Sequence, residues 1–183
     1  MDPTLRREIL DILSEANDLT IATVREDGFP QATTVSFASE DLDIYFGTAA
    51  TSQKAYNLSR ENRVSLTINL PYANWGEIRG LSASARAERL TDPGELEKAG
   101  RLLSEKFPQG IAEYASDVLE GIAFFRVRPE VVSLLDYRKG FGHTKLIELR
   151  GGRRAPLNQP FTPASWPNGA RSGQIVPPTV ARR

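Results

Sequence analysis

The sequence of 183 residues has no cysteine and a single histidine, His143. The absence of cysteine excludes disulfides, thiolate catalysis, iron–sulfur clusters and cysteine-ligated zinc. One histidine excludes a histidine-rich metal site, and a catalytic triad would have to use His143. We therefore expect no metal site.

The chain also lacks an excess of charge of one sign and a long apolar run. Lys and Arg number 23, as do Asp and Glu, so the formal net charge is zero, which argues against a general nucleic-acid binder. No apolar segment approaches the roughly 20 residues of a membrane span. The charged N-terminus lacks the apolar core of a signal peptide. We expect a cytoplasmic protein that binds neither nucleic acid nor membrane.

Charge is nevertheless unevenly distributed along the chain. Residues 150–183 contain six Arg, no acidic residue and six of the 12 prolines. Because proline removes a backbone donor and blocks helices and central strands, this segment is either a disordered tail or an ordered arm on an acidic surface. We therefore expect a domain over residues 1–149 and a Pro/Arg-rich C-terminal arm over residues 150–183.

Two segments have the start signal of a helix, an acidic cap followed by proline. Asp2 and Pro3 begin an amphipathic helix that ends near Asn17. The segment Asp92-Pro93-Gly94-Glu95 resembles a capping box and begins a second helix with an apolar face to Phe107. A short helix is predicted over Ile111–Leu119.

The remaining apolar segments alternate as strands do. Leu19–Val24, Gln31–Ala38 and Leu42–Gly47 predict a three-stranded meander. The other predicted strands are Val64–Leu70, Ile78–Leu90 with Gly80 marking a bulge or bend, Ile122–Val127, Val131–Leu135 and Lys145–Leu149. Because βα units do not alternate, we predict a mainly β fold, a small antiparallel barrel with peripheral helices.

The segment between a strand ending at Gly47 and a helix beginning near Ser52 carries the first candidate site. Thr48, Thr51 and Ser52 surround Lys54, which lies in the first helical turn against the helix dipole. Unpaired N–H groups, hydroxyls and an ammonium make a phosphate cradle. The alternative is a Ser/Thr cap beside a solvated lysine.

The segment from Asp136 to Lys145 is the second candidate. Tyr137 and Phe141 could stack on a planar ring, the glycines on either side of Phe141 allow close approach, and His143 could meet an anion. Alternatively, Phe141 is ordinary core and His143 lies on the surface.

Polar strand positions are a third candidate. Thr33 and Thr34, like Ser65, Thr67 and Asn69 on another strand, could hydrogen-bond a heterocycle or simply face solvent. Trp75 could wall a pocket, contribute to a dimer interface or fold over the core.

The order of these segments resembles the pyridoxamine 5′-phosphate oxidase-like, FMN-binding split-barrel superfamily. The resemblance covers about residues 5–149. It rests on Leu19–Val24 with Asp27–Gln31, on Ile44–Thr48 with Ser52–Lys54, Asn57-Leu58 and Asn62–Leu66, and on Gly140–Thr144.

The resemblance implies an antiparallel split barrel that forms a homodimer with cofactor sites between subunits. Thr48, Ser52, Gln53 and Lys54 would be at the flavin phosphate. Thr33, Thr34 and Val35 would line the flavin ring. Phe141 and His143 would reach the same site or that of the partner.

The sequence departs from the pyridoxamine oxidase itself. Gln53 and Thr33 stand where that enzyme usually has Arg, and its Arg-x-His substrate signature is missing. The resemblance therefore implies an FMN-dependent oxidoreductase that passes hydride between a reduced nicotinamide or small organic substrate and FMN, without oxidising vitamin B6.

Other functions remain open on the same fold. One is a deazaflavin (F420)-dependent reductase. Another is a haem-binding or haem-handling protein with His143 as the axial ligand. The last is a non-enzymatic flavin-binding module.

Overall fold

The structure is a computed structural model that describes residues 1–109 and 121–149. Two of its helices begin at the acidic caps that the sequence predicts. In helix α1 (Pro3–Glu15), the Asp2 carboxylate accepts a hydrogen bond from the backbone N–H of Thr4 at 2.7 Å. In helix α3 (Pro93–Lys106), Asp92 caps the backbone N–H of Glu95 at 3.0 Å. Both predicted helices are confirmed.

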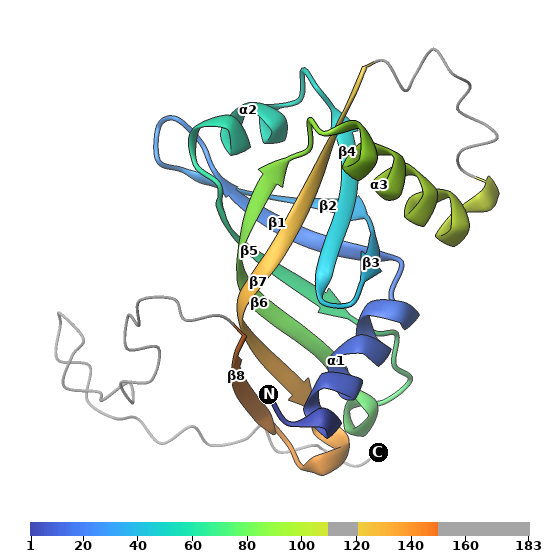
Figure 1. Ribbon diagram of the computed structural model, residues 1–183. Coiled ribbons are helices and arrows are strands. Elements are labelled where there is room, and N and C mark those ends of the chain that lie inside the picture. Colours follow the sequence, from blue (N-terminus) through green and yellow to red (C-terminus); the bar gives the residue numbers. More distant parts are fainter. Residues whose placement is uncertain (110–120, 150–183) are drawn as a thin grey trace, which may run out of the picture. The chain divides into compact units, whose positions relative to one another are not determined.

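Eight antiparallel strands form one curled sheet with the order β2-β1-β5-β6-β7-β4-β3, and β8 pairs with β7 (Figure 1). Their bounds are β1 Asp18–Val24, β2 Pro30–Ser36, β3 Ala38–Glu40, β4 Asp43–Ala49, β5 Arg63–Asn69, β6 Arg79–Arg89, β7 Ile122–Asp136 and β8 Thr144–Glu148. Helix α2 (Gln53–Arg60) follows β4, and short 3₁₀ turns η1 (Trp75–Glu77) and η2 (Tyr137–Lys139) precede β6 and β8. The predicted fold class, an antiparallel split barrel with peripheral helices, is confirmed.

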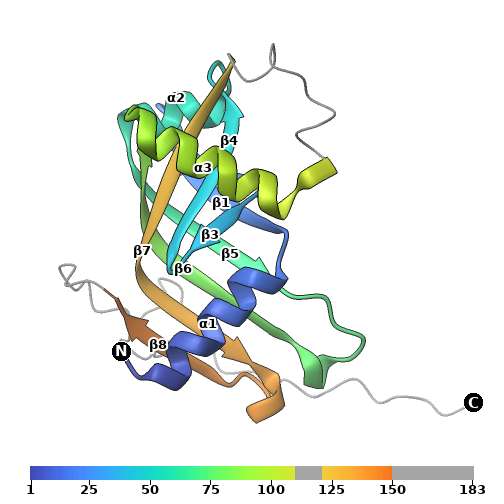
Figure 2. The ribbon, with the colours of Figure 1, turned by 45° about the vertical axis from the view of Figure 1, so that its right-hand side comes forward.

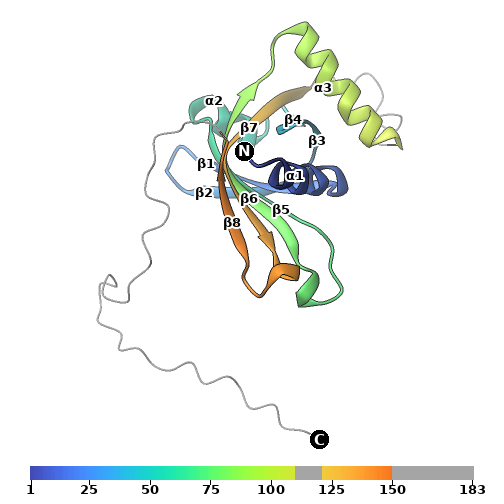
Figure 3. The same ribbon diagram turned by 60° about the horizontal axis from the view of Figure 1, so that its bottom comes forward.

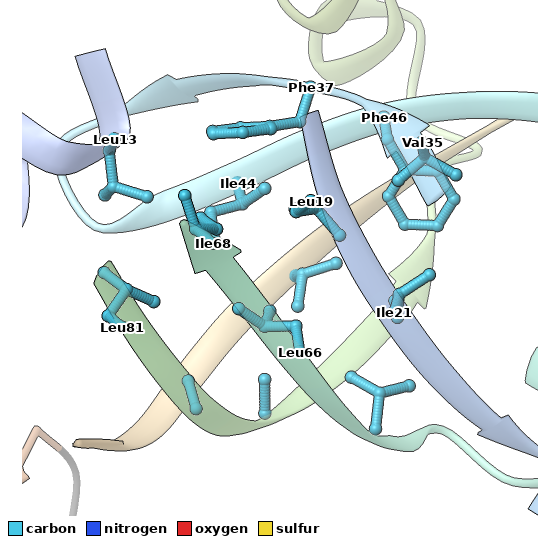
Figure 4. Packing of buried hydrophobic residues seen from close by; sticks show 14 of the residues in the cluster. Leu13, Leu19, Ile21, Val35, Phe37, Ile44, Phe46, Leu66, Ile68 and Leu81 are labelled. Atoms are coloured by element: carbon cyan, nitrogen blue, oxygen red, sulfur yellow. The ribbon is translucent and has the colours of Figure 1, made fainter. Parts of the chain in front are cut away.

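The core fills the concave side of this sheet. Inward positions alternate with outward ones, as in β5, where Val64, Leu66 and Ile68 are buried. Side chains from α1 and several strands meet there, Leu13 and Leu66 among them (Figure 4). Figure 3 shows α1 against the concave side of the curl. The alternation in the sequence thus predicted which strand face is buried.

Helices α1 and α3 (Figure 2) pack on opposite faces of strand β4. Helix α1 packs with the cluster that contains Ile44 and Phe46, whereas α3 packs with Tyr45, which points the other way. The last turn of α3 meets the end of α1, where the Lys106 ammonium donates hydrogen bonds to the carbonyls of Ala16 at 2.6 Å and Leu13 at 3.2 Å. These carbonyls have no partner inside α1, so the lysine stabilises the end of that helix.

The predicted three-stranded meander is wrong. Strands β1 and β2 pair as expected, but β4 pairs with β7, with Phe46 opposite Phe125, and β2 and β3 end at opposite edges of the sheet. Phe37, between β2 and β3, is fully buried. Apolar alternation determines which face a strand buries, but closure of the barrel determines its neighbour.

The closing strands also differ from the prediction. Residues 122–136 form one strand, β7. Ser84 pairs with Val131 and Ala85 with Pro129, so Glu130 is the extra residue of a bulge. Proline is tolerated at such a bulge, and the strand therefore continues through Pro129. The bulge therefore lies opposite β6 and away from Gly80. A Cβ atom at Gly80 would lie 2.5 Å from the carbonyl oxygen of Ile68, so close backbone approach requires this glycine.

Two other predictions concern residues outside the described ranges. The helix at Ile111–Leu119 and the arm over residues 150–183 stay predictions. In the part of the chain that the structure describes, no helix has the length and apolar character needed to cross a membrane.

Candidate functional site

The first candidate site forms where β4 ends and α2 begins. Ser52 is the N-cap of α2, and its Oγ accepts a hydrogen bond from the backbone N–H of Ala55 at 3.2 Å. The Thr48 hydroxyl lies 3.2 Å from the same oxygen. The N–H groups of the first helical turn have no partner inside the helix and create a partial positive charge. This cap was predicted; it joins Thr48 to Ser52, and Lys54 follows in the first turn of the helix.

Lys54 is the unusual residue of this site because its side chain is buried. The residue is 8% exposed, and its Nζ lies 5.7 Å from the centroid of the Phe46 ring. Within residues 1–109 and 121–149, no hydrogen bond or ion pair of its side chain is seen. Burial lowers the pKa of the Lys54 ammonium below its usual value of 10.5. Lysines are rarely buried without a partner, so the site has the character of an anion site.

Gln53 faces a neighbour within the protein. Its side-chain amide donates a hydrogen bond to Oδ1 of Asn57 at 2.9 Å. Asn57 is fully buried and donates in turn to Oγ1 of Thr23 at 2.9 Å and to Oε1 of Gln31 at 3.0 Å. Sequence reasoning missed this role of Asn57. An amide within an otherwise apolar helix face, one position before Leu58, is the signal that could have revealed it.

The three candidate residues of β2 do not share one face. Thr33 and Val35 point inward, whereas Thr34 is exposed on the outside of the sheet. The Oγ1 atom of Thr33 is buried and has no hydrogen-bond partner among the described residues. Such a buried hydroxyl costs free energy unless a partner arrives.

The turn between β7 and β8 carries the other candidates. Phe141 is 80% exposed, and its ring stacks on Trp75 at 6.2 Å and tilts against Tyr137 at 5.2 Å. His143 is exposed as well. Helix α2 and this turn lie at opposite ends of the barrel (Figure 1). Within one chain, the structure therefore does not bring Phe141 or His143 to Lys54.

Asp136 organises that turn. It is buried, and its carboxylate accepts hydrogen bonds from Nε and Nη2 of Arg138, both at 2.8 Å. The paired guanidinium lowers the pKa of Asp136 to about 2. The backbone N–H of Asp136 also donates to the carbonyl of His143 at 3.0 Å. The turn is thus a defined structure that presents its aromatic rings to solvent.

Ten neighbouring outward positions on the convex side of β2, β1, β5, β6 and β7 carry no charge, and charged residues such as Arg63 and Arg86 flank them. One row of paired residues crosses these strands as Thr34, Thr20, Thr67, Ser82 and Ser133, and the next as Ala32, Ala22, Ser65, Ser84 and Val131. We call these ten residues the uncharged face. The surface of a soluble domain normally intersperses charges of both signs. The absence of charge at these positions therefore marks the face as unlike ordinary solvent-facing surface.

Comparisons with known proteins agree with this architecture. Among solved structures, the conserved hypothetical protein Rv2991 from Mycobacterium tuberculosis is 27% identical with a TM-score of 0.66, and the match covers 79% of this chain and 91% of that one. A putative pyridoxamine 5′-phosphate oxidase from Listeria innocua is 23% identical (TM-score 0.58; 72% and 98% covered). The haem storage protein HutZ from Vibrio cholerae is 22% identical (TM-score 0.59; 69% and 90% covered). No curated protein matches the chain significantly.

A family model provides the assignment. The model described as pyridoxamine 5′-phosphate oxidase matches residues 5–136, from α1 to the end of β7. The matched region contains the N-terminus of α2 with Lys54, the inward face of β2 and the uncharged face. The chain belongs to the pyridoxamine 5′-phosphate oxidase family.

Proposed function

We propose that the protein binds FMN with its phosphate at the N-terminus of α2 and is an FMN-dependent oxidoreductase. The observation that carries this proposal is Lys54 in the first turn of α2, a largely buried residue whose ammonium has no hydrogen-bond or ion-pair partner among the described residues. A phosphate monoester would supply the negative charge that this position lacks.

The residues present fit such a phosphate. The Lys54 ammonium would pair with it, and the hydroxyls of Thr48 and Ser52 and the first N–H groups of α2 would donate to its oxygens. The buried hydroxyl of Thr33 has no hydrogen-bond partner among the described residues and would meet a polar edge of the flavin ring near β2. Because Gln53 donates its amide to Asn57, the phosphate would rely on Lys54 and the helix for charge.

Bound FMN would supply two-electron hydride chemistry with a reduced nicotinamide or a small organic substrate. The protein's own groups bind and orient. Lys54 and the α2 N-terminus hold the anionic end, and the inward side chains of β2 exclude water beside the core. Since neither a thiol nor an activated histidine is needed for these tasks, the composition of the chain suits this chemistry.

We propose further that the protein is a homodimer packed through the uncharged face. Small, uncharged side chains allow two sheets to approach closely without burying charge. The turn between β7 and β8, which carries Phe141 and His143, lies at the opposite end of the barrel from α2 (Figure 1). A second copy of the chain would bring this turn to the site.

Visible spectroscopy and FMN titration test the cofactor. The purified protein, supplied with FMN, is expected to show flavin bands and to quench flavin fluorescence on binding. Lys54→Met should weaken FMN binding by about 100-fold, the scale of losing a buried charged hydrogen-bond donor of ~3 kcal/mol. Lys98→Met, on α3, is the matched control and should bind as the wild type does. FMN binding that is absent, or that is unaffected by Lys54→Met, would reject the proposal.

Haem handling is the second candidate function. The observation in its favour is the exposed His143 on the same turn as the exposed Phe141 ring, an imidazole beside an apolar surface. HutZ, which shares the fold, is described as a haem storage protein. A Soret band that disappears in His143→Ala, in protein that does not bind FMN, would select haem. Uptake of a deazaflavin in place of FMN would retain the reductase chemistry with another cofactor.

A further inference from the structure

We infer that Asn57 is a positioning residue for the α2 anion site. Its buried carboxamide ties the first turn of α2 to β1 and β2, and thereby sets where Lys54 and Gln53 stand. This inference rests on the proposed function, because it concerns the same FMN phosphate site.

The geometry of Asn57 is that of a junction. Its Oδ1 accepts from Gln53 at 2.9 Å, and its Nδ2 donates to Thr23 at 2.9 Å and to Gln31 at 3.0 Å. Asn57 is 0% exposed and Thr23 is 2% exposed. A buried amide is tolerated only when it is hydrogen-bonded, and here its three bonds reach three different elements: α2, β1 and β2.

Helix α2 needs such a tie because it is short. It has 8 residues, and its buried apolar side chains are Ala55 and Leu58. A helix of this length is marginal without tertiary contacts, and two apolar anchors leave its rotation weakly determined. Residues three and four apart share a helix face, so Asn57 lies about one turn after Gln53 and Lys54 on the same face of α2.

The same junction reaches the second part of the proposed site. Gln31 lies two positions before Thr33 on β2, so both side chains point to the same side of that strand. Thr23 completes the connection, since its hydroxyl lies 3.5 Å from the carbonyl oxygen of Gln31. Asn57 therefore couples the helix that would hold the phosphate to the strand that carries the orphaned hydroxyl.

Binding of FMN and of riboflavin by the full chain tests this role, because riboflavin lacks the phosphate. In Asn57→Ala, FMN affinity is expected to fall by about tenfold or more, the scale of losing an outer hydrogen-bond partner of a binding group, while riboflavin affinity changes by less than about twofold. The matched control Asn62→Ala, just beyond the C-terminal end of α2, should leave both affinities unchanged.

A second variant guards against loss of folding. Gln31→Met removes one arm of the junction from the strand side and should lower the FMN-to-riboflavin affinity ratio in the same direction, by a smaller factor. Equal losses for FMN and riboflavin, or an unchanged ratio in folded Asn57 and Gln31 variants, would show a merely structural amide and overturn the inference alone. Wild-type protein that binds FMN no better than riboflavin would overturn the phosphate site and the inference with it.

Discussion

At the scale of single residues, Lys54 is where stability and function conflict. The residue is 8% exposed and its ammonium has no hydrogen-bond or ion-pair partner within the described ranges, so its burial costs free energy and lowers its pKa. Lys98 has the opposite environment: it pairs with Glu40, which raises its pKa. The same chemical group is therefore a liability at one position and a stabilising contact at the other.

Replacement of each lysine by methionine should reveal this contrast. Without cofactor, Lys54→Met is expected to raise the free energy of unfolding by about 1 kcal/mol, because it removes a buried charge and keeps the volume. Lys98→Met should lower it by up to about 1 kcal/mol, the usual range of a partly exposed ion pair. Urea unfolding of both variants measures this. A destabilised Lys54→Met protein would contradict the account of Lys54 as an unpaired charge.

The pH dependence of FMN binding follows from the same residue. Burial lowers the pKa of Lys54 in the unliganded protein, and a bound phosphate dianion would raise it again, so binding is coupled to protonation of Lys54. FMN affinity should therefore stay level at neutral pH and fall as the pH rises through the lowered pKa. Titrations across alkaline pH test this, with riboflavin as the flat control. A parallel fall for riboflavin would assign the effect to another group.

At the scale of elements, close contact between strands explains what composition leaves open. Gly80 of β6 pairs with Asn69 of β5. A Cβ at Gly80 would lie 2.5 Å from the backbone oxygen of Ile68, so the two strands would have to move apart. Gly100 of α3 has no heavy atom within 4 Å of the corresponding position. The two glycines look alike in sequence but differ in what surrounds them.

Alanine substitution should therefore act with opposite sign at these glycines. Gly80→Ala is expected to destabilise the protein by about 2–3 kcal/mol through overpacking against β5. Gly100→Ala should stabilise it by up to about 1 kcal/mol, since alanine is the better helix former and meets no obstacle. Chemical denaturation of both variants provides the measurement. Equal effects at the two positions would mean that the strand contact is not as close as described.

At the scale of the whole molecule, two features support the proposed homodimer: the uncharged face and the separation of the two candidate regions. Helix α2, which carries Lys54, lies at one end of the barrel, and the turn between β7 and β8 lies at the other (Figure 1). The ten residues of the uncharged face, on β2, β1, β5, β6 and β7, are suited to contact with a second copy of the chain. In this proposal, the functional unit is larger than one chain.

Placing a charge on that face should separate the copies. Thr67→Arg, at the centre of the uncharged face, is expected to yield a monomer and to weaken FMN binding together with dimerisation, because burying an unpaired guanidinium is costly. Thr91→Arg, an exposed position in the loop before α3, serves as the matched control. Analytical ultracentrifugation gives the mass. A dimer that persists in Thr67→Arg would place the interface elsewhere.

The sequence by itself determined the features that depend on neighbouring residues. Asp2 and Asp92 cap helices because their side chains reach backbone N–H groups two or three residues away, and β5 buries one face because its apolar residues alternate. The position of Lys54 in the first turn of α2 was evident in the same way, since Ser52 is a cap. The antiparallel barrel class followed from the number and spacing of such segments.

Only the tertiary structure decided the features that join distant parts of the chain. Closure of the sheet determines the pairing of β4 with β7, the burial of Lys54 and the junction at Asn57. It also places α2 and the turn between β7 and β8 at opposite ends of the barrel. Closure brings together residues far apart in sequence, so no local period or cap encodes it. A polar side chain such as Asn57 acquires its role from partners on β1 and β2 that the fold supplies.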